Sequence, residues 1–256
     1  MAVIRRDFLP SDATPLLANA GIDAVVAVQA DHSEGETDFL LSLAGQNDFI
    51  RGVVGWVDLR ADDLDERVAR WSSAQALKGF RHIAQGEPDD FLTRPDVIAG
   101  IRRIGELGYT YDILIYPRQL AAALELVQQC PGVQFVLDHC AKPAIATGDL
   151  AEWQKGISSI ARYENVTCKV SGLVTEASWS SWTYDDLRPV LDTVADAFGP
   201  ERLMFGSDWP VCLLAAEYSR VADVIERWAA QWSEIERARV FGGTAVAVYD
   251  LKAPTA

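Results

Sequence analysis

The chain has 256 residues, of which 49% are hydrophobic and 23% charged, and its formal net charge is −14. This composition supports a large buried core and excludes a disordered chain. The acidic balance argues against nucleic acids and membranes as partners, because both bind basic surfaces. No secretory signal opens the chain, no apolar stretch is long enough to span a membrane, and the four cysteines lack disulfide spacing. We therefore expect a cytoplasmic protein.

Short apolar and β-branched runs alternate with longer amphipathic segments from one end of the chain to the other. Seven such runs predict strands: Ala24–Val28, Gly52–Val57, Leu77–Phe80, Tyr111–Ile115, Val133–Leu137, Val166–Val170 and Leu203–Gly206. Between them, apolar residues at three- and four-residue steps predict helices, as at Leu64, Val68 and Trp71. Buried strands separated by helices are typical of a parallel sheet.

The βα pattern predicts one domain over residues 1–256, since no linker or shift in composition divides the chain. A (β/α)₈ barrel commonly needs roughly 250 residues, which matches this length. An open doubly wound sheet is the competing topology, but no Gly-x-Gly-x-x-Gly follows the first strand. A closed barrel has eight strands, whereas seven are visible here.

Three ionisable side chains lie at the ends of predicted strands. The chain has only three histidines, and His82 and His139 each close a strand-like run, while Asp208 closes a third. Catalytic groups of parallel barrels come from the carboxyl ends of several strands, so these residues predict an active site there. The alternatives remain open: Asp208 could cap the next helix, and each histidine could be a satisfied structural residue.

Two basic residues neighbour this candidate site. Arg81 precedes His82 and could offer a bidentate fork to a carboxylate or carbonyl oxygen, or serve as an internal ion-pair partner. Lys142 follows His139 by three residues and could contact a substrate oxygen, or be a solvated loop charge. Asp138 alternates with His139 along the strand, so we expect it on the opposite face as a buried hydrogen-bonding residue.

Several longer motifs of the chain point to one family. They are GVVGWVDL, LKGFRH, YDILI, VQFVLDHCAKP, VTCKVSGLVTEA, RLMFGSDWPVC and GGTAVAVYDL. From about Arg6 to Leu251 the chain resembles the amidohydrolase-related sugar-lactonase family, which includes L-fuconolactonase and rhamnonolactonase-like hydrolases. The resemblance implies a TIM-like barrel, lactone hydrolysis and a catalytic aspartate at Asp208, with His139, His82 and Arg81 in the pocket.

The chain departs from this family at its amino end. The family begins with a strand that carries a His-x-His pair, which ligates metal in the wider superfamily, and neither that pair nor a histidine in YDILIYP occurs here. Asp208 and His139 remain as the matched ligands for a divalent metal such as zinc, and a tight zinc site wants at least one more donor. Either the start was assigned too far downstream, or N-terminal residues or a partner subunit cover the gap.

Lactone hydrolysis is the first functional hypothesis, with a small-molecule sugar lactone as the partner and the oligomeric state open. Asp208 would deprotonate a water that attacks the lactone carbonyl. His82, Arg81 or His139 would stabilise the developing oxyanion. Three aromatic residues could offer faces to the sugar ring or could equally be packing residues: Tyr116, Trp179 and Trp209.

Two further hypotheses use the same residues. A metal-assisted, non-oxidative decarboxylase occurs among amidohydrolase relatives, although that chemistry generally needs ligands from the first strand. The other hypothesis is that the chain is truncated and catalytically inactive and only binds sugar acids, because a barrel that lacks one strand leaves unpaired sheet edges.

Overall fold

A single parallel sheet organises the protein, whose computed structural model describes residues 2–252. Its strands pair consecutively in the order β1 to β7. Their bounds are β1 Val25–Val28, β2 Ile50–Gly55, β3 Leu77–Ile83, β4 Thr110–Leu114, β5 Phe135–Leu137, β6 Val166–Val170 and β7 Leu203–Phe205. The predicted strands are confirmed, and the consecutive order rules out a doubly wound sheet, in which the strand order reverses.

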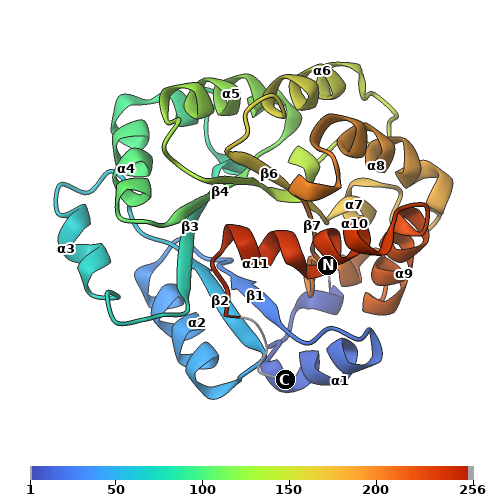
Figure 1. Ribbon diagram of the computed structural model, residues 1–256, viewed down its shortest axis with the longest axis horizontal. Coiled ribbons are helices and arrows are strands. Elements are labelled where there is room, and N and C mark those ends of the chain that lie inside the picture. Colours follow the sequence, from blue (N-terminus) through green and yellow to red (C-terminus); the bar gives the residue numbers. More distant parts are fainter. Residues whose placement is uncertain (1, 253–256) are drawn as a thin grey trace.

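Helices follow most of the strands and ring the outer side of the curved sheet, where Figure 1 shows α3, α4, α5, α6 and α8. The helices are α1 Pro10–Asn19, α2 Glu34–Gln46, α3 Leu64–Ala69, α4 Pro95–Glu106, α5 Leu120–Gln129, α6 Ala151–Ile160, α7 Leu173–Glu176, α8 Tyr184–Phe198, α9 Tyr218–Ala229, α10 Glu234–Ala238 and α11 Thr244–Val248. Among residues 2–252, none of them has the length and apolar character needed to cross a bilayer.

Helix α8 illustrates how local sequence sets these elements. The Thr183 backbone N–H donates to the Asp186 carboxylate at 2.7 Å, which closes a capping box at the helix start. Buried residues at three- and four-residue steps, from Leu187 to Phe198, face the sheet. Gly199 ends the helix with φ of +69°, a conformation that glycine adopts without strain.

The two faces of the sheet differ in chemistry. The convex face packs apolar side chains such as Phe80, Tyr111 and Phe135 into the main core under the helices. The concave face carries a smaller apolar cluster that includes Val54, Val136 and Met204, and Tyr249 at the end of α11 completes it. Figure 1 shows α11 lying across this face, so the C-terminal helix covers the inside of the curved sheet.

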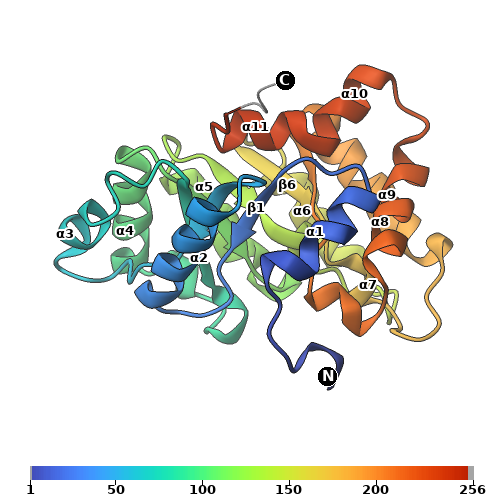
Figure 2. The ribbon, with the colours of Figure 1, turned by 90° about the horizontal axis from the view of Figure 1, so that it is seen from below.

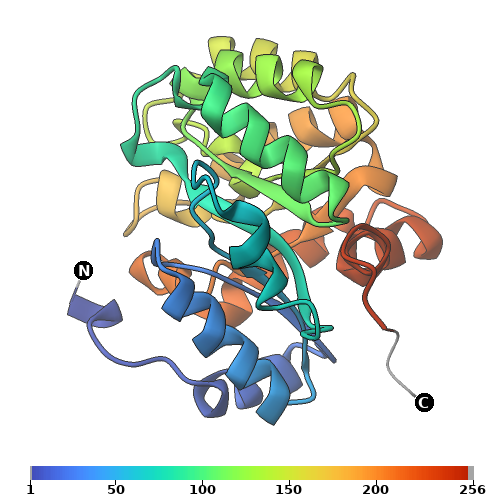
Figure 3. The same cartoon turned by 90° about the vertical axis from the view of Figure 1, so that its left-hand side faces the viewer.

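The curved sheet stays open in the part of the chain that the structure describes. There, β1 pairs only with β2, and β7 pairs only with β6. Residues 2–19 add no strand; they form a 3-10 turn, Ala2–Ile4, which contacts the turn Val211–Leu214, and α1, which lies beside α9 (Figure 2). Figure 3 shows the amino-terminal turn and α11 on opposite sides of the sheet. Because the segment that this turn contacts, Val211–Leu214, follows β7, the turn lies near the carboxyl end of that strand.

Candidate active site

His139 and Asp208 meet at the carboxyl edge of the sheet, just beyond β5 and β7. The His139 Nε2 atom lies 3.6 Å from the Asp208 Oδ1 atom, and each side chain keeps 11% of its surface exposed. The second carboxylate oxygen, Asp208 Oδ2, is buried and has no hydrogen-bond partner among the described residues. A buried polar atom without a partner is costly, so it marks a position where a ligand or water can be bound.

The backbone at both residues is strained. His139, Cys140, Ala141 and Lys142 form a left-handed turn with φ between 49° and 56°, and Asp208 has φ of 55°. Left-handed conformations cost non-glycine residues roughly 1–2 kcal/mol each, and such strain concentrates at functional sites. The strained positions coincide with two of the three residues that the strand-end pattern singled out.

Buried contacts hold the left-handed turn in place. The Trp153 indole N–H donates to the Cys140 carbonyl oxygen at 2.7 Å, and the Lys142 backbone N–H donates to the His139 carbonyl oxygen at 2.8 Å. The Lys142 ammonium then pairs with the Glu176 carboxylate of α7 at 2.7 Å. These contacts fix where the imidazole of His139 points.

Burial controls the charge of His139. It lowers the pKa of the imidazole below 6.5, and the nearby Asp208 carboxylate opposes that shift only in part. The ring is therefore neutral at pH 7, with one ring nitrogen protonated and the other free to accept.

A network of four charged side chains occupies the concave face beneath the site. We call Arg81, Asp112, Asp138 and Lys169 the interior charge network. The Lys169 ammonium lies 2.5 Å from Asp112 and 2.7 Å from Asp138, and the Arg81 guanidinium donates to Asp138 at 2.7 Å. Tyr249 donates its hydroxyl to Asp112 at 2.8 Å, which ties the end of α11 to the network.

The network contains two cations and two anions, and burial and these neighbours together shift the pKa values of its two carboxyl groups. Burial alone would raise the pKa of Asp138, but Lys169 and Arg81 hold this pKa well below its usual range. At Asp112 burial prevails over Lys169 and the pKa is raised. Asp138 is a buried residue of the interior, as predicted, but strand alternation does not explain its position, because β5 ends at Leu137 and both Asp138 and His139 lie in the turn beyond it.

Arg81 takes the internal role of the two that its sequence position left open. Besides its ion pair with Asp138, it donates to the side-chain and backbone oxygens of Gln29. Strand β3 continues through Arg81 and His82, which pair with β4, so it is longer than predicted. Arg81 is thus a structural ion-pair partner here, and its predicted contact with substrate has no support in this geometry.

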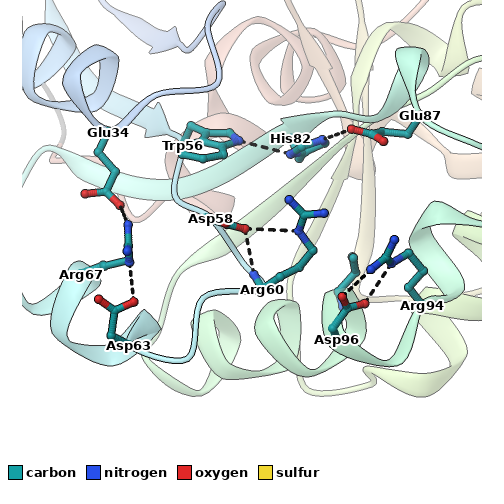
Figure 4. Close-up of polar contacts among 11 residues, drawn as sticks. Glu34, Trp56, Asp58, Arg60, Asp63, Arg67, His82, Glu87, Arg94 and Asp96 are labelled. Carbon is teal, nitrogen blue, oxygen red and sulfur yellow. Dashed lines mark hydrogen bonds and ion pairs between the residues drawn. The ribbon is translucent and has the colours of Figure 1, made fainter.

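His82 belongs to a different cluster from His139. Its Nδ1 atom accepts the Trp56 indole N–H at 3.2 Å, and its Nε2 atom lies 3.0 Å from Glu87 Oε1, as Figure 4 shows. The His32 ring stacks on it at 4.0 Å. His82 lies at the end of β3 and His139 beyond β5, with β4 between these two strands. The three strand-end residues share one edge, but only His139 and Asp208 touch.

The remaining predicted site residues differ in how exposed they are and in whether they already have a partner. Lys142 is neither free nor solvated, because it pairs with Glu176. Tyr116 and Trp179 are 40% and 44% exposed, so their rings are available to a ligand. Trp209 packs edge-on against Phe8 at 5.3 Å, which favours its packing role.

Two surface hollows lie away from the His139–Asp208 pair. One, of about 230 Å³, lies between α1 and α9, and the other, of about 680 Å³, lies at the amino ends of β2 and β3. Neither is lined by His139, Asp208 or His82. Charge and strain, rather than the size of a hollow, therefore identify the candidate site.

Sequence reasoning missed several partners of the predicted residues. Ser171 follows β6 and places its hydroxyl oxygen 2.8 Å from His139 Nδ1. Its position at a strand end is the same signal that singled out His139, so the rule could have found it. Trp56, which contacts His82, directly follows β2 and could have been found in the same way. Glu87, which also contacts His82, and Glu176, which pairs with Lys142, come from a loop and a short helix and carry no comparable signal.

The donor set at the pair does not make up a zinc site. His139 Nε2 and Asp208 supply two donors, whereas zinc takes three or four ligands from protein. Across residues 2–252 no three His, Cys, Asp or Glu side chains are grouped so that they could hold a metal ion.

Fold and strand-end site together define a class of protein. The sequence pattern of the amidohydrolase family matches residues 2–251, and the chain belongs to that family of enzymes. It is 45% identical over 266 residues to L-fucono-1,5-lactonase of Burkholderia multivorans, covering 99% of this chain and 90% of the relative. It is 36% identical over 261 residues to L-fucono-1,5-lactonase of Burkholderia ambifaria, covering 98% of this chain and 88% of the relative.

Solved structures agree with the family assignment. A crystal structure of an amidohydrolase from Burkholderia multivorans with bound zinc superposes with a TM-score of 0.96 at 44% identity, over 98% of this chain and 92% of that chain. A 5-carboxyvanillate decarboxylase from Sphingomonas paucimobilis superposes with a TM-score of 0.67 at 16% identity, over 97% of this chain and 85% of that chain. The first likeness reinforces the family, and the second concerns the fold alone.

Proposed function

We propose that the protein hydrolyses a sugar lactone, opening an aldono-lactone to its acid with Asp208 as the general base. One observation carries the proposal: Asp208 has a buried oxygen without a hydrogen-bond partner, as Asp112 and Asp138 do, but among the described residues no lysine or arginine pairs with it, and it lies on strained backbone beside His139. A carboxylate that no cation has neutralised can accept a proton from water. The similarity to the two Burkholderia L-fucono-1,5-lactonases supports the substrate class.

Asp208 can both take and return the one proton that moves during lactone hydrolysis. A water oxygen bonds to the lactone carbonyl carbon while its proton passes to Asp208, an assistance worth roughly 10²–10⁴-fold. The carbonyl oxygen becomes an oxyanion, and a donor aimed at it contributes about 3–4 kcal/mol to lowering the barrier. The bond to the ring oxygen then breaks, and Asp208 returns the proton to that oxygen, which leaves the open acid.

Of the predicted oxyanion donors, His139 has the best geometry. Its Nε2 atom faces Asp208, so a carbonyl attacked by water at Asp208 would lie beside it. Arg81 is engaged by Asp138 and Gln29, and His82 is engaged by Glu87 two strands away. The exposed rings of Tyr116 and Trp179 can stack on the apolar face of a sugar.

Asp208→Asn tests the proposal on a panel of aldono-lactones that begins with L-fucono-1,5-lactone. Asp196→Asn is the matched control, because Asp196 is an exposed residue of α8. Acid release is measured through the protons that it produces. We expect kcat to fall roughly 10²–10⁴-fold in Asp208→Asn and to stay unchanged in Asp196→Asn. A variant that keeps most of its activity would remove Asp208 from this role. Carbon dioxide release by the native protein would favour a decarboxylase, and sugar-acid binding without turnover would favour an inactive binding protein.

A further inference from the structure

Ser171 stands behind His139, in a space that two glycines keep open. The Ser171 hydroxyl lies 2.8 Å from His139 Nδ1 and is buried. A Cβ atom at Gly206 would approach the Ser171 Cβ atom to 2.9 Å, and a Cβ atom at Gly172 would approach the His139 ring to 2.8 Å. Larger residues at these two positions would push the pair apart, so the contact depends on the local sequence of β6 and β7.

The direction of this hydrogen bond follows from the other side of the ring. If His139 Nδ1–H donated to Ser171, the Nε2 lone pair would face the Asp208 carboxylate at 3.6 Å, which is repulsive. If the Ser171 hydroxyl donates to Nδ1, the single ring proton sits on Nε2 and points towards Asp208. The second arrangement satisfies both contacts, and the first satisfies one.

We propose that Ser171 is a positioning residue that holds His139 as the Nε2–H tautomer, so that this N–H faces Asp208 and the reacting carbonyl. The inference deepens the proposed lactone hydrolysis and rests on it for the role of His139. An imidazole with one ring proton can carry it on either nitrogen, and the partner of one nitrogen decides where that proton resides.

Ser171 is placed to act on His139. Its hydroxyl contacts Nδ1 on the side of the ring opposite to Asp208, which lies at Nε2. Ser171 is also buried more deeply than His139, at 4% exposed against 8%. The serine therefore acts through His139 rather than on the substrate.

The tautomer can be read directly, because the chain has only three histidines. A proton–nitrogen correlation spectrum of the ring nitrogens of the ¹⁵N-labelled protein separates protonated from unprotonated nitrogens, and His139→Gln assigns the pattern of that ring. We expect Nε2–H in the native protein and a shift towards Nδ1–H in Ser171→Ala. Thr167→Ala is the control, because it also removes a buried hydroxyl from β6, one that donates to the Phe135 carbonyl oxygen at 3.2 Å.

Kinetics provide the second readout. Ser171→Ala should lower kcat on the order of 10–100-fold with KM unchanged, the size typical when the outer partner of a functional histidine is removed. Ser171→Cys keeps the volume with a weaker donor and should fall between the alanine variant and the native protein. A variant of Ser171 with the native tautomer and native kcat overturns the proposal, and so does an acyl adduct trapped on Ser171. The spectra need no substrate, so they judge the tautomer even if Asp208→Asn disproves lactone hydrolysis.

Discussion

The interior charge network and the His139–Asp208 pair lie next to each other, yet they treat buried charge in opposite ways. Each carboxylate of the network has a cation within 2.7 Å, and two cations balance two anions. Among residues 2–252, Asp112 and Asp138 each also have one oxygen without a hydrogen-bond partner, as Asp208 does, so the difference lies in the charges: at the strand ends, Asp208 has only neutral His139, at 3.6 Å.

This difference separates structural from chemical roles. A balanced buried network has little capacity left for a ligand, and removing one member leaves an uncompensated charge that is costly. An under-partnered carboxylate on strained backbone is costly in the folded protein but can take a proton or a water molecule. Adjacent residues along one chain, Asp138 and His139, belong to the two different regions.

Lys169→Met should produce the largest loss of stability, because it leaves Asp112 and Asp138 buried with one cation fewer. We expect the free energy of unfolding in urea to fall by about 3–5 kcal/mol. Lys155→Met is the control, since the Lys155–Glu152 pair is exposed and worth about 0–1 kcal/mol. Equal losses in the two variants would contradict a network that neutralises buried charge.

Gly172→Ala should destabilise the protein less than Lys169→Met does, but it should lower activity more than its matched control, Gly148→Ala. Both Gly172 and Gly148 have positive φ, of 64° and 70°, so alanine at either position should cost roughly 1–2 kcal/mol in unfolding free energy. Only at Gly172 would the new Cβ atom meet the His139 ring, because nothing lies within 4 Å at Gly148. Lactone turnover should therefore fall only in Gly172→Ala. Equal turnover in the two variants would show that the position of the His139 ring does not affect catalysis.

Asp208→Asn should leave stability nearly unchanged, in contrast to its effect on turnover. The amide removes a poorly partnered charge, so we expect a change within about 1 kcal/mol, or a slight gain, in thermal or urea unfolding. A loss as large as that of Lys169→Met would place Asp208 among the structural charges instead.

The pH dependence of stability should reveal the burial of His139. Its folded pKa is lowered below 6.5, so below pH 6.5 the unfolded chain binds a proton that the folded chain resists. The stabilisation is complete above pH 6.5 and is lost as the pH falls towards the folded pKa. His139→Gln should flatten urea-unfolding free energies in this range. His32, whose pKa burial also lowers, accounts for a further part, which His32→Gln measures; an unchanged curve in both would contradict the shifts.

Much of the fold could be predicted from local patterns. Strands β1 to β7 and helices such as α3 and α4 appeared as apolar runs and three- to four-residue periodicities, because burial on one or two faces constrains residue type along the chain. The strand-end rule also placed His139 and Asp208 at one edge, because parallel strands end on the same side.

The sequence by itself determined the strands, their parallel arrangement and the edge of the sheet where the candidate site lies. Only the tertiary structure decided which residues on that edge meet: His139 joins Asp208 and Ser171, while His82 joins Trp56 and Glu87. Those contacts are set by the spacing of the strands, the direction of each side chain and the left-handed turn at His139. Each of these depends on residues that are tens of positions apart in the chain. The type of a residue and its position on a strand do not reveal whether an opposite charge lies beside it. Arg81 has such a partner in Asp138, whereas Asp208 has only the neutral ring of His139.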